Sequence, residues 1–211
     1  MSMRLLFIFF GIDLFFIVLH LVLGASYDLF NLDRERTPAA LWSAFQLAGC
    51  AYALLIITIA SSQSIQRMLW TTAAIVFILL SFDEISEFHE NIVYYLVTYI
   101  PPLPFLWSGT PMWAIFMSPL IIAVCGLLIL VIRELFRHRR ILGWCASSAL
   151  SLFVIALALE FLGGIRSLES FLPVLVIIEE AFELAAESLF LFSLSIFARD
   201  RFFSRYEVKQ L

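Results

Sequence analysis

Four glutamates occur in two pairs, and each pair has the spacing of one helical turn. Glu87 and Glu90 form the first pair, and Glu180 and Glu183 form the second. Side chains at positions i and i+3 lie on one face of a helix, so each pair can offer two carboxylates to one ligand. Both pairs lie within or at the edge of apolar segments, where acidic residues are rare and costly. This placement favours a binding site over a solvated helix face.

Glu160 and His20 can each add one ligand to these pairs from two further apolar segments. The resulting set is similar to the carboxylate-bridged dimetal site of ferritin-like bundles, in which two helices carry a Glu-x-x-His pair and two others carry a single Glu. The resemblance is limited to this chemistry, because the pairs here are Glu-x-x-Glu. Oxygen-rich ligation with one imidazole favours iron or manganese, with calcium or magnesium as further options.

Other ionisable residues in the same segments are secondary candidates for this site. They are Asp13, Asp83, Glu84, His89, Glu179 and Glu187. Counting about 1.5 Å per helical residue from the nearest basic residues places most of the acids in the outer third of a bilayer about 30 Å thick, with Gln46 near the same level. No Lys or Arg lies inside the apolar segments at that depth. The carboxylates must therefore be neutralised by protons or by bound cations.

Simpler structural roles are open for some of these residues. The stretch 83–90 can cap a helix where it reaches the aqueous layer. His20 lies seven residues after Asp13 on the same helix face, so it can be a core histidine that donates to that carboxylate. The three cysteines, Cys50, Cys125 and Cys145, all fall in apolar runs without a CxxC spacing, which is typical of small buried side chains.

The elements that must position these residues follow from composition. Of 211 residues, 63% are hydrophobic and only 14% are charged, and the mean hydropathy is +1.00. A water-soluble globule cannot be built from this mixture. Apolar runs of bilayer-spanning length predict six transmembrane helices over residues 5–24, 39–60, 68–89, 112–132, 141–162 and 171–198. The predicted fold is all-α, a polytopic membrane helical bundle that forms one transmembrane domain over residues 1–211.

The basic residues predict the orientation of this bundle. One side of the predicted membrane would hold Arg4, Arg67, Arg133, Arg137, Arg139, Arg140, Arg199, Arg201, Arg205 and Lys209. The other side would hold only Arg34, Arg36 and Arg166. Because cytoplasmic loops carry the excess of Lys and Arg, both termini are expected in the cytoplasm. The loop 91–111, rich in Pro and aromatic residues, is then an outer interfacial segment, and we expect the plasma (cytoplasmic) membrane.

Three functions are compatible with this pattern. The first is a metal-binding membrane protein, an oxidoreductase-like or accessory enzyme that acts on a lipid-soluble or small substrate. The second is a proton- or cation-translocating protein that uses the same carboxylates, although no ionisable residue continues the path through the inner half of the spans. The third is a non-catalytic subunit of a larger membrane complex or a homo-oligomer. The net charge of −4 argues against nucleic acid as a partner. The lipid bilayer is the expected partner in every case.

Overall fold

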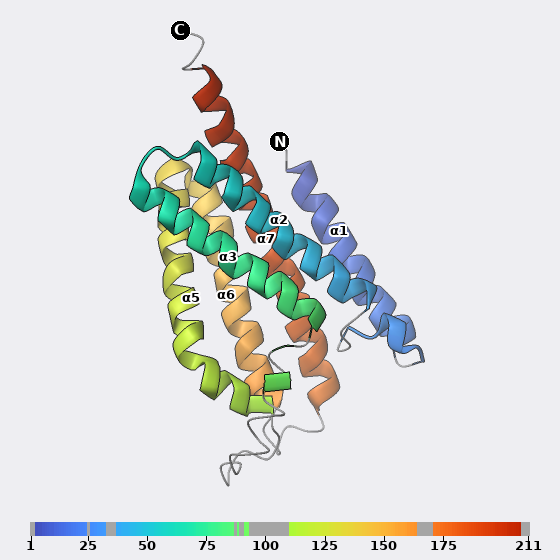
Figure 1. Ribbon diagram of the computed structural model, residues 1–211. Helices are drawn as coiled ribbons and strands as arrows, with labels where there is room; N and C mark the ends of the chain where they lie inside the picture. Colours follow the sequence, from blue (N-terminus) through green and yellow to red (C-terminus); the bar gives the residue numbers. More distant parts are fainter. Residues whose placement is uncertain are drawn as a thin grey trace.

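All secondary-structure elements in the described part of the chain are helices (Figure 1). The computed structural model describes residues 3–24, 26–32, 37–86, 88, 91–92, 110–163 and 171–207, with side chains apart from those of 110–115 and 204–207. The α-helices are α1 (Arg4–Leu19), α2 (Pro38–Ala60), α3 (Ser64–Ser86), α5 (Thr110–His138), α6 (Arg140–Gly163) and α7 (Leu172–Glu207). A π-helical turn, η1 (His20–Gly24), continues α1, and a short 3-10 helix, η2 (Asp28–Phe30), follows it.

Five helical segments are long and apolar enough to cross a membrane. They are Arg4–Gly24, Pro38–Ala60, Ser64–Ser86, Phe116–His138 and Arg140–Gly163. The expected all-helical, membrane-spanning character is therefore confirmed. The sixth predicted span, residues 171–198, lies within α7, a helix of 36 residues.

The helix boundaries differ from the predicted spans mainly at charged residues. The predicted fourth span ends at residue 132, whereas α5 continues to His138 and is separated from α6 by Arg139 alone. The predicted sixth span ends at residue 198, whereas α7 continues to Glu207. Arg and Glu are good helix formers, so the charges that end an apolar run do not end the helix. The predicted limit of the third span, residue 89, lies outside the described residues.

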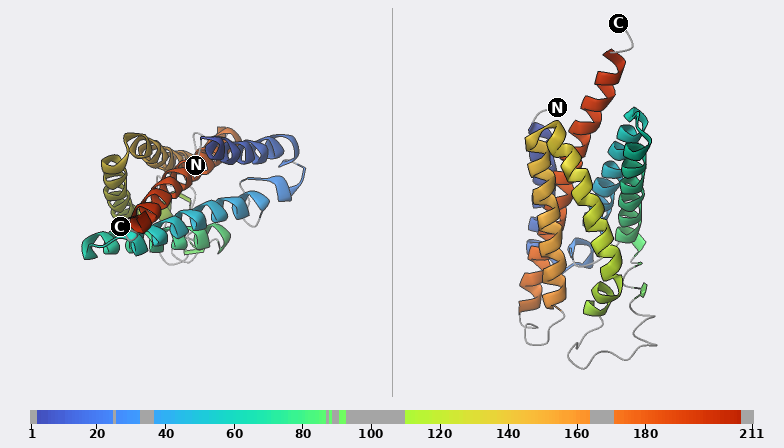
Figure 2. Two further views of the ribbon diagram at one scale, coloured as in Figure 1. Left: turned by 90° about the horizontal axis from the view of Figure 1, so that it is seen from above. Right: turned by 90° about the vertical axis from the view of Figure 1, so that its left-hand side faces the viewer.

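The long helix α7 lies between the other helices. Seen from above in Figure 2, it runs obliquely between the α2–α3 pair and the α5–α6 pair, with α1 along its side. It packs against α1, α2, α5 and α6, whereas α1 packs among the long helices chiefly on α7. The position of α7 explains why most of its residues between Leu184 and Ala198 are buried.

Aromatic side chains connect α7 to both helix pairs. The fully buried ring of Phe190 lies 5.6 Å from Phe77 of α3 and 6.0 Å from Phe153 of α6, measured between ring centroids. One end of α7 is held in the same way, because Phe197 lies 5.5 Å from Trp70 of α3. Offset and edge-on aromatic pairs of this kind add to the packing energy of buried rings. They fix α7 against α3, although α7 packs more extensively on α6 and α2.

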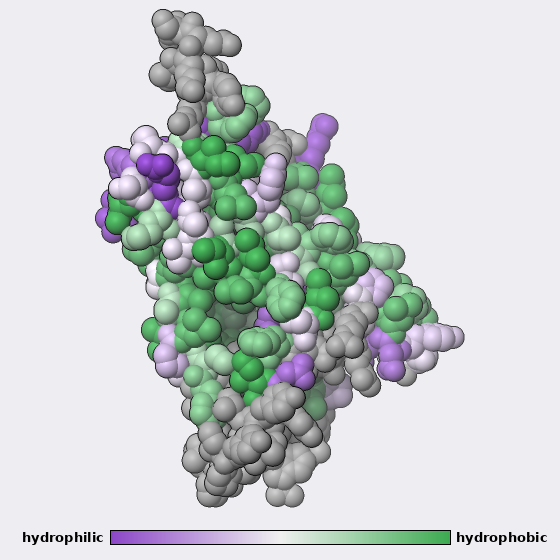
Figure 3. Space-filling model, in the orientation of Figure 1, coloured by the Kyte–Doolittle hydropathy of each residue, from purple (hydrophilic) through white to green (hydrophobic). Residues whose placement is uncertain are grey.

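The surface is suited to lipid. Figure 3 shows that apolar side chains cover the middle of one face, with polar residues gathered toward its ends. Large exposed side chains such as Phe7, Phe15, Phe45 and Ile59 contribute to the apolar exterior of α1 and α2. Such an extensive apolar exterior would aggregate in water but is stable in hydrocarbon. The cysteines are all free, and Cys50 is fully buried as the sequence indicated, whereas Cys125 and Cys145 are only partly buried.

The turn between α5 and α6 provides a test of this packing. A Cβ atom on Gly143 would clash with the ring of Phe136, whereas one on Gly126 would have no neighbour within 4 Å. We expect Gly143→Ala to lower the free energy of unfolding by about 1–3 kcal/mol through overpacking. Gly126→Ala should be neutral or stabilising by up to about 1 kcal/mol, because alanine favours the helix. Thermal unfolding in detergent measures both, and equal melting temperatures for the two variants would contradict the close packing at this turn.

Candidate functional site

The carboxylate of Asp13 is the centre of a buried polar network. Its Oδ1 atom accepts hydrogen bonds from Trp42 Nε1 at 2.8 Å and from Gln46 Nε2 at 2.9 Å. Its Oδ2 atom accepts one from Ser188 Oγ at 2.6 Å. Asp13 lies on α1, and its donors come from α2 and α7. Hydrogen bonds to an ionised acceptor are short and about twice as strong as neutral ones. The network therefore joins three helices at one carboxylate.

Helical spacing on α2 explains how its donors converge. Trp42 and Gln46 are four residues apart, so both side chains project from one face of the helix. The start of α2 is fixed by Thr37, whose hydroxyl accepts a hydrogen bond from the Ala40 amide at 3.2 Å, and by Pro38 in the first turn. Gln46 also donates to Ser188 Oγ at 3.2 Å. The amide of Gln46 thus bridges Asp13 and α7 directly.

Glu187 is the neighbouring acid, and its hydrogen bonding is incomplete. Its Oε1 atom accepts from Ser43 Oγ at 2.6 Å, and its side chain is almost fully buried. Its Oε2 atom is buried and has no hydrogen-bond partner among the described residues, and the same is true of Gln46 Oε1. Buried polar atoms without partners are uncommon in native proteins and call for an explanation. Asp13 and Glu187 lie in adjacent parts of one interface but differ sharply in how well they are satisfied.

Other acids surround Glu187. Glu84 of α3, Glu183 of α7 and Asp13 are near enough for their charges to act on it. Gln46, which was placed near the same depth, donates a hydrogen bond to Asp13, whereas the meeting of the acidic faces of several helices stays a prediction. Like charges in a low-dielectric interior repel strongly, so this grouping requires a compensating cation or proton.

The predicted metal ligands are distributed over several elements. Glu160 lies on α6, and Glu180 and Glu183 lie on α7, while Glu87 and Glu90 lie outside the described residues. Of the secondary candidates, Asp83 and Glu84 are on α3, Glu179 and Glu187 on α7 and Asp13 on α1, and His89 lies outside the described residues. Within the part of the chain that the structure describes, no group of three or more His, Cys, Asp or Glu side chains is arranged to hold a metal ion.

His20 has a structural contact in place of the one expected. Its Nδ1 atom accepts a hydrogen bond from the Leu32 amide at 3.0 Å. The suggestion that His20 donates to Asp13 is wrong, because the partners of Asp13 are on α2 and α7. A Cβ atom on Gly24 would lie 2.8 Å from His20 Nδ1. The imidazole therefore fits against a glycine in the π-helical turn and holds the segment that follows α1.

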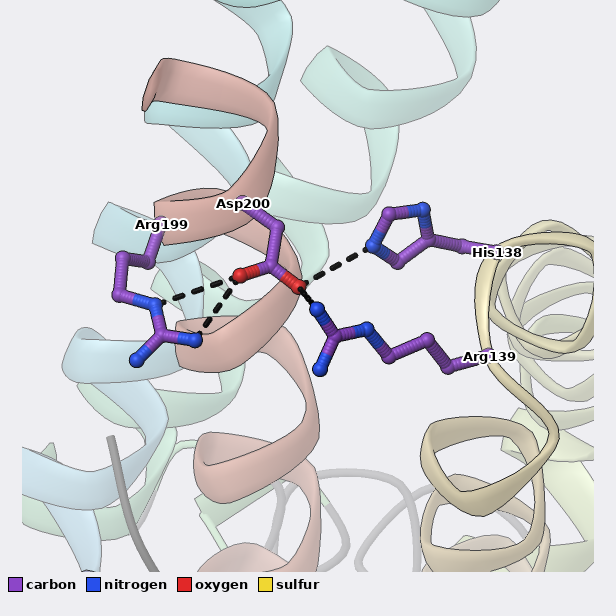
Figure 4. Close-up of polar contacts among 4 residues, drawn as sticks. All are labelled: His138, Arg139, Arg199 and Asp200. Atoms are coloured by element: carbon purple, nitrogen blue, oxygen red, sulfur yellow. Dashed lines mark hydrogen bonds and ion pairs between the residues drawn. The ribbon is translucent and has the colours of Figure 1, made fainter. Parts of the chain in front are cut away.

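A second polar cluster lies beyond the apolar part of α7 and joins it to the α5–α6 turn (Figure 4). Asp200 accepts hydrogen bonds from Arg199 Nη2 at 2.9 Å and Nε at 3.3 Å, and it pairs with Arg139 Nη2 at 2.9 Å. His138 Nε2 lies 3.2 Å from its Oδ2 atom. Burial raises the pKa of Asp200, but the hydrogen bonds from Arg199 and His138 and the charge of Arg139 outweigh that effect.

The net result is a pKa of Asp200 below its ordinary value. A depressed carboxylate pKa stabilises the folded state at neutral pH, and this contribution is lost as the pH falls through the lowered pKa. The cluster therefore connects the α5–α6 turn to α7 over the whole physiological pH range.

Sequence reasoning missed the donors of the network. Trp42, Ser43 and Ser188 were not among the candidate residues, although they supply three of the four hydrogen bonds to Asp13 and Glu187. The available signal was the presence of Ser43 and Gln46 one turn apart in the otherwise apolar α2. Polar residues at this spacing in a membrane helix indicate an interhelical contact.

The fold and the buried polar network define the class of protein: an all-helical protein with several helices suited to span a membrane. Within this class, the chain belongs to a family described as a domain of unknown function, DUF8692, whose model matches residues 6–198. No curated protein matches the chain. No solved structure matches it either. The matched range contains Asp13, Glu187 and every donor of the network.

The contribution of the network can be measured with two serines of α7. Ser188 donates across helices to Asp13, whereas Ser193 donates to the carbonyl oxygen of Leu189 in its own helix. Both side chains are fully buried. We expect Ser188→Ala to lower the free energy of unfolding by about 1.5–3 kcal/mol, the range for a hydrogen bond to a charged group. Ser193→Ala should cost less than about 1 kcal/mol, because its helix bond is dispensable. Unfolding by titration with denaturing detergent compares them, and equal losses would contradict a special role for Ser188.

Proposed function

We propose that this protein is a six-span membrane protein, with both termini in the cytoplasm, that binds and releases a proton at Glu187. The observation that carries the proposal is the buried Oε2 atom of Glu187, which lacks a partner among the described residues while other acids act on the same side chain. A proton on Glu187 removes one negative charge and turns an orphan acceptor into a donor.

The six-span arrangement is supported by α7 and by the chain ends. A helix of 36 residues is about 54 Å long, enough to cross a bilayer and continue beyond it. The N- and C-terminal ends lie toward the same end of the molecule in Figure 1, as an even number of crossings requires. The basic residues gathered at that end favour the cytoplasmic side of a plasma membrane.

Proton binding and release from one side of the membrane fits the sequence of α7 better than proton transport through the membrane. Toward the cytoplasmic end of α7, the residues between Glu187 and Arg199 include serines but no ionisable side chain. Asp13 is a poor alternative carrier, because three donors already hold its two oxygen atoms. Ser188, which follows Glu187 on α7, is one of those donors. The charge on Glu187 can therefore act on the contact that docks α1, and protonation would act as a switch of helix packing.

A metal ion is the second candidate for the same place. The observation that favours it is the approach of Glu84 and Glu183 from two helices to Glu187. A dinuclear iron or manganese site would also need Glu87, Glu90, Glu160 and Glu180, as the spacing suggests. Such a centre would make the protein an oxidoreductase-like or accessory membrane enzyme. Carboxylates that bind two divalent ions would lose them when one ligand is removed.

The orientation is tested by labelling single cysteines in a variant without Cys50, Cys125 and Cys145. A cysteine at Ser108 should react with a membrane-impermeant maleimide applied from outside, and a cysteine at Ser204 should react only after the membrane is opened. The physical basis is the excess of basic residues on the proposed cytoplasmic side. The reverse labelling pattern would refute the proposed orientation.

The proton site is tested by infrared spectroscopy of the purified protein with elemental analysis of the same samples. Wild type should show a carboxylic acid C=O band that titrates with pH, and Glu187→Gln should lose that band while keeping its fold, since glutamine resembles the protonated side chain. Glu134→Gln, which removes an acid paired with Arg137 on α5, is the matched control and should retain the band.

The same samples distinguish the metal site. If wild type contains stoichiometric iron or manganese and Glu183→Gln does not, the bound species is a metal ion and not a proton. A wild type that contains no metal and shows no titrating band assigned to Glu187 would reject both candidates.

A further inference from the structure

The turn between α5 and α6, together with the adjoining part of α7, carries a concentrated positive charge. Its arginines are Arg133, Arg137, Arg139, Arg140, Arg199 and Arg201. The acids in these same stretches are Glu134 and Asp200. Phe197 of α7 contacts the turn, because the His138 ring lies 5.0 Å from its ring centroid, and the Arg201 guanidinium of α7 lies 5.1 Å from the same centroid. These stretches thus contain six arginines and two acids.

The ion pairs leave much of this charge exposed. Asp200 is shared between Arg139 and Arg199, so one negative charge serves two positive ones (Figure 4). The side chain of Arg139 remains 53% exposed and that of Arg137 remains 57% exposed although it pairs with Glu134. Arg140, at the start of α6, is exposed as well. A ligand with a negative charge would meet guanidinium groups that are held in place but still accessible.

Apolar side chains lie directly beside these arginines. Ile141 and Trp144, in the first turn of α6, are both more than half exposed. The indole of Trp144 packs edge-on against Phe136, with the ring centroids 5.4 Å apart. Tryptophan is enriched where membrane helices meet the headgroup layer, because its ring is amphipathic. A charged group and an acyl chain could thus be bound side by side.

We propose that this surface, the α5–α6 turn with the adjoining part of α7, binds an anionic phospholipid from the leaflet that it faces. Arginine suits the phosphate group, because its planar fork can donate two parallel hydrogen bonds. Basic sites between membrane helices are established receptors for acidic headgroups. The exposed Ile141 and Trp144 then contact the acyl chains, which a soluble phosphate ion does not possess. The site requires that the helices span a membrane but is independent of what binds at Glu187.

The test uses delipidated protein in neutral detergent and native mass spectrometry. Short-chain phosphatidylglycerol is the probe, and phosphatidylcholine of the same chain length is its neutral counterpart. Wild type should prefer phosphatidylglycerol at least tenfold. Each basic residue near an acidic headgroup raises the affinity for the lipid roughly fivefold. Arg140→Gln should therefore weaken binding about fivefold, and the double variant Arg137→Gln with Arg140→Gln should weaken it about 25-fold. These changes leave the contacts of Asp200 with Arg139, Arg199 and His138 in place.

Arg4→Gln is the matched control, because it removes one exposed arginine from α1, outside the proposed surface. It should weaken binding no more than about twofold. Equal losses from Arg4→Gln and Arg140→Gln would mean attraction by net charge alone and would overturn the proposal. An equal affinity for the two lipids would also overturn it. Displacement of the lipid by inorganic phosphate at the same concentration would show a site for phosphate and reject the lipid as its ligand.

Discussion

The docking of α1 depends on one buried carboxylate. α1 has only two buried residues, Leu6 and Asp13, so very little of its apolar surface is covered by other helices. In a bilayer, apolar contact between helices has little driving force, because lipid is as apolar as the side chains it would replace. The three hydrogen bonds to Asp13 supply the specific attraction instead. Without them, α1 would have few reasons to lie against α7 at a particular register.

That arrangement gives two neighbouring acids different chemical roles. Asp13 accepts hydrogen bonds from three donors and is suited to a structural role, because both of its carboxyl oxygen atoms are satisfied. Glu187 has a single donor, Ser43, and an oxygen atom without a partner among the described residues. Both acids contact α2 within a single turn of that helix, through Trp42, Ser43 and Gln46. The difference arises because the available donors are directed at the first acid, which leaves the second dependent on a proton or a cation.

Much of the fold was predictable, because bilayer thickness sets the length of apolar runs. Five of the six predicted spans coincide with helices suited to cross a membrane, and the sixth lies in α7. The shared acidic layer stays a prediction, although Gln46, which was placed near the same level, does contact Asp13. The rotation and tilt of each helix could not be predicted, because the direction of single polar atoms such as Ser188 Oγ is set by packing and not by periodicity. For the same reason, His20 was placed on the face of Asp13 but hydrogen bonds to the turn beyond α1.

Two acids of α7, Asp200 and Glu187, differ in how their negative charge is compensated. At one end, Asp200 is surrounded by arginines close to water, so its charge is balanced locally and its role is to hold the α5–α6 turn. Deeper in the helix, Glu187 has acids as neighbours and lies in a helix without Lys or Arg between Leu172 and Ala198. A purely structural contact there would be served better by an uncharged side chain, since buried polar groups without partners destabilise a fold. The carboxyl group at that point is therefore the basis of the proposal that Glu187 binds a proton, and the hydroxyl of Ser43 holds its Oε1 atom in place.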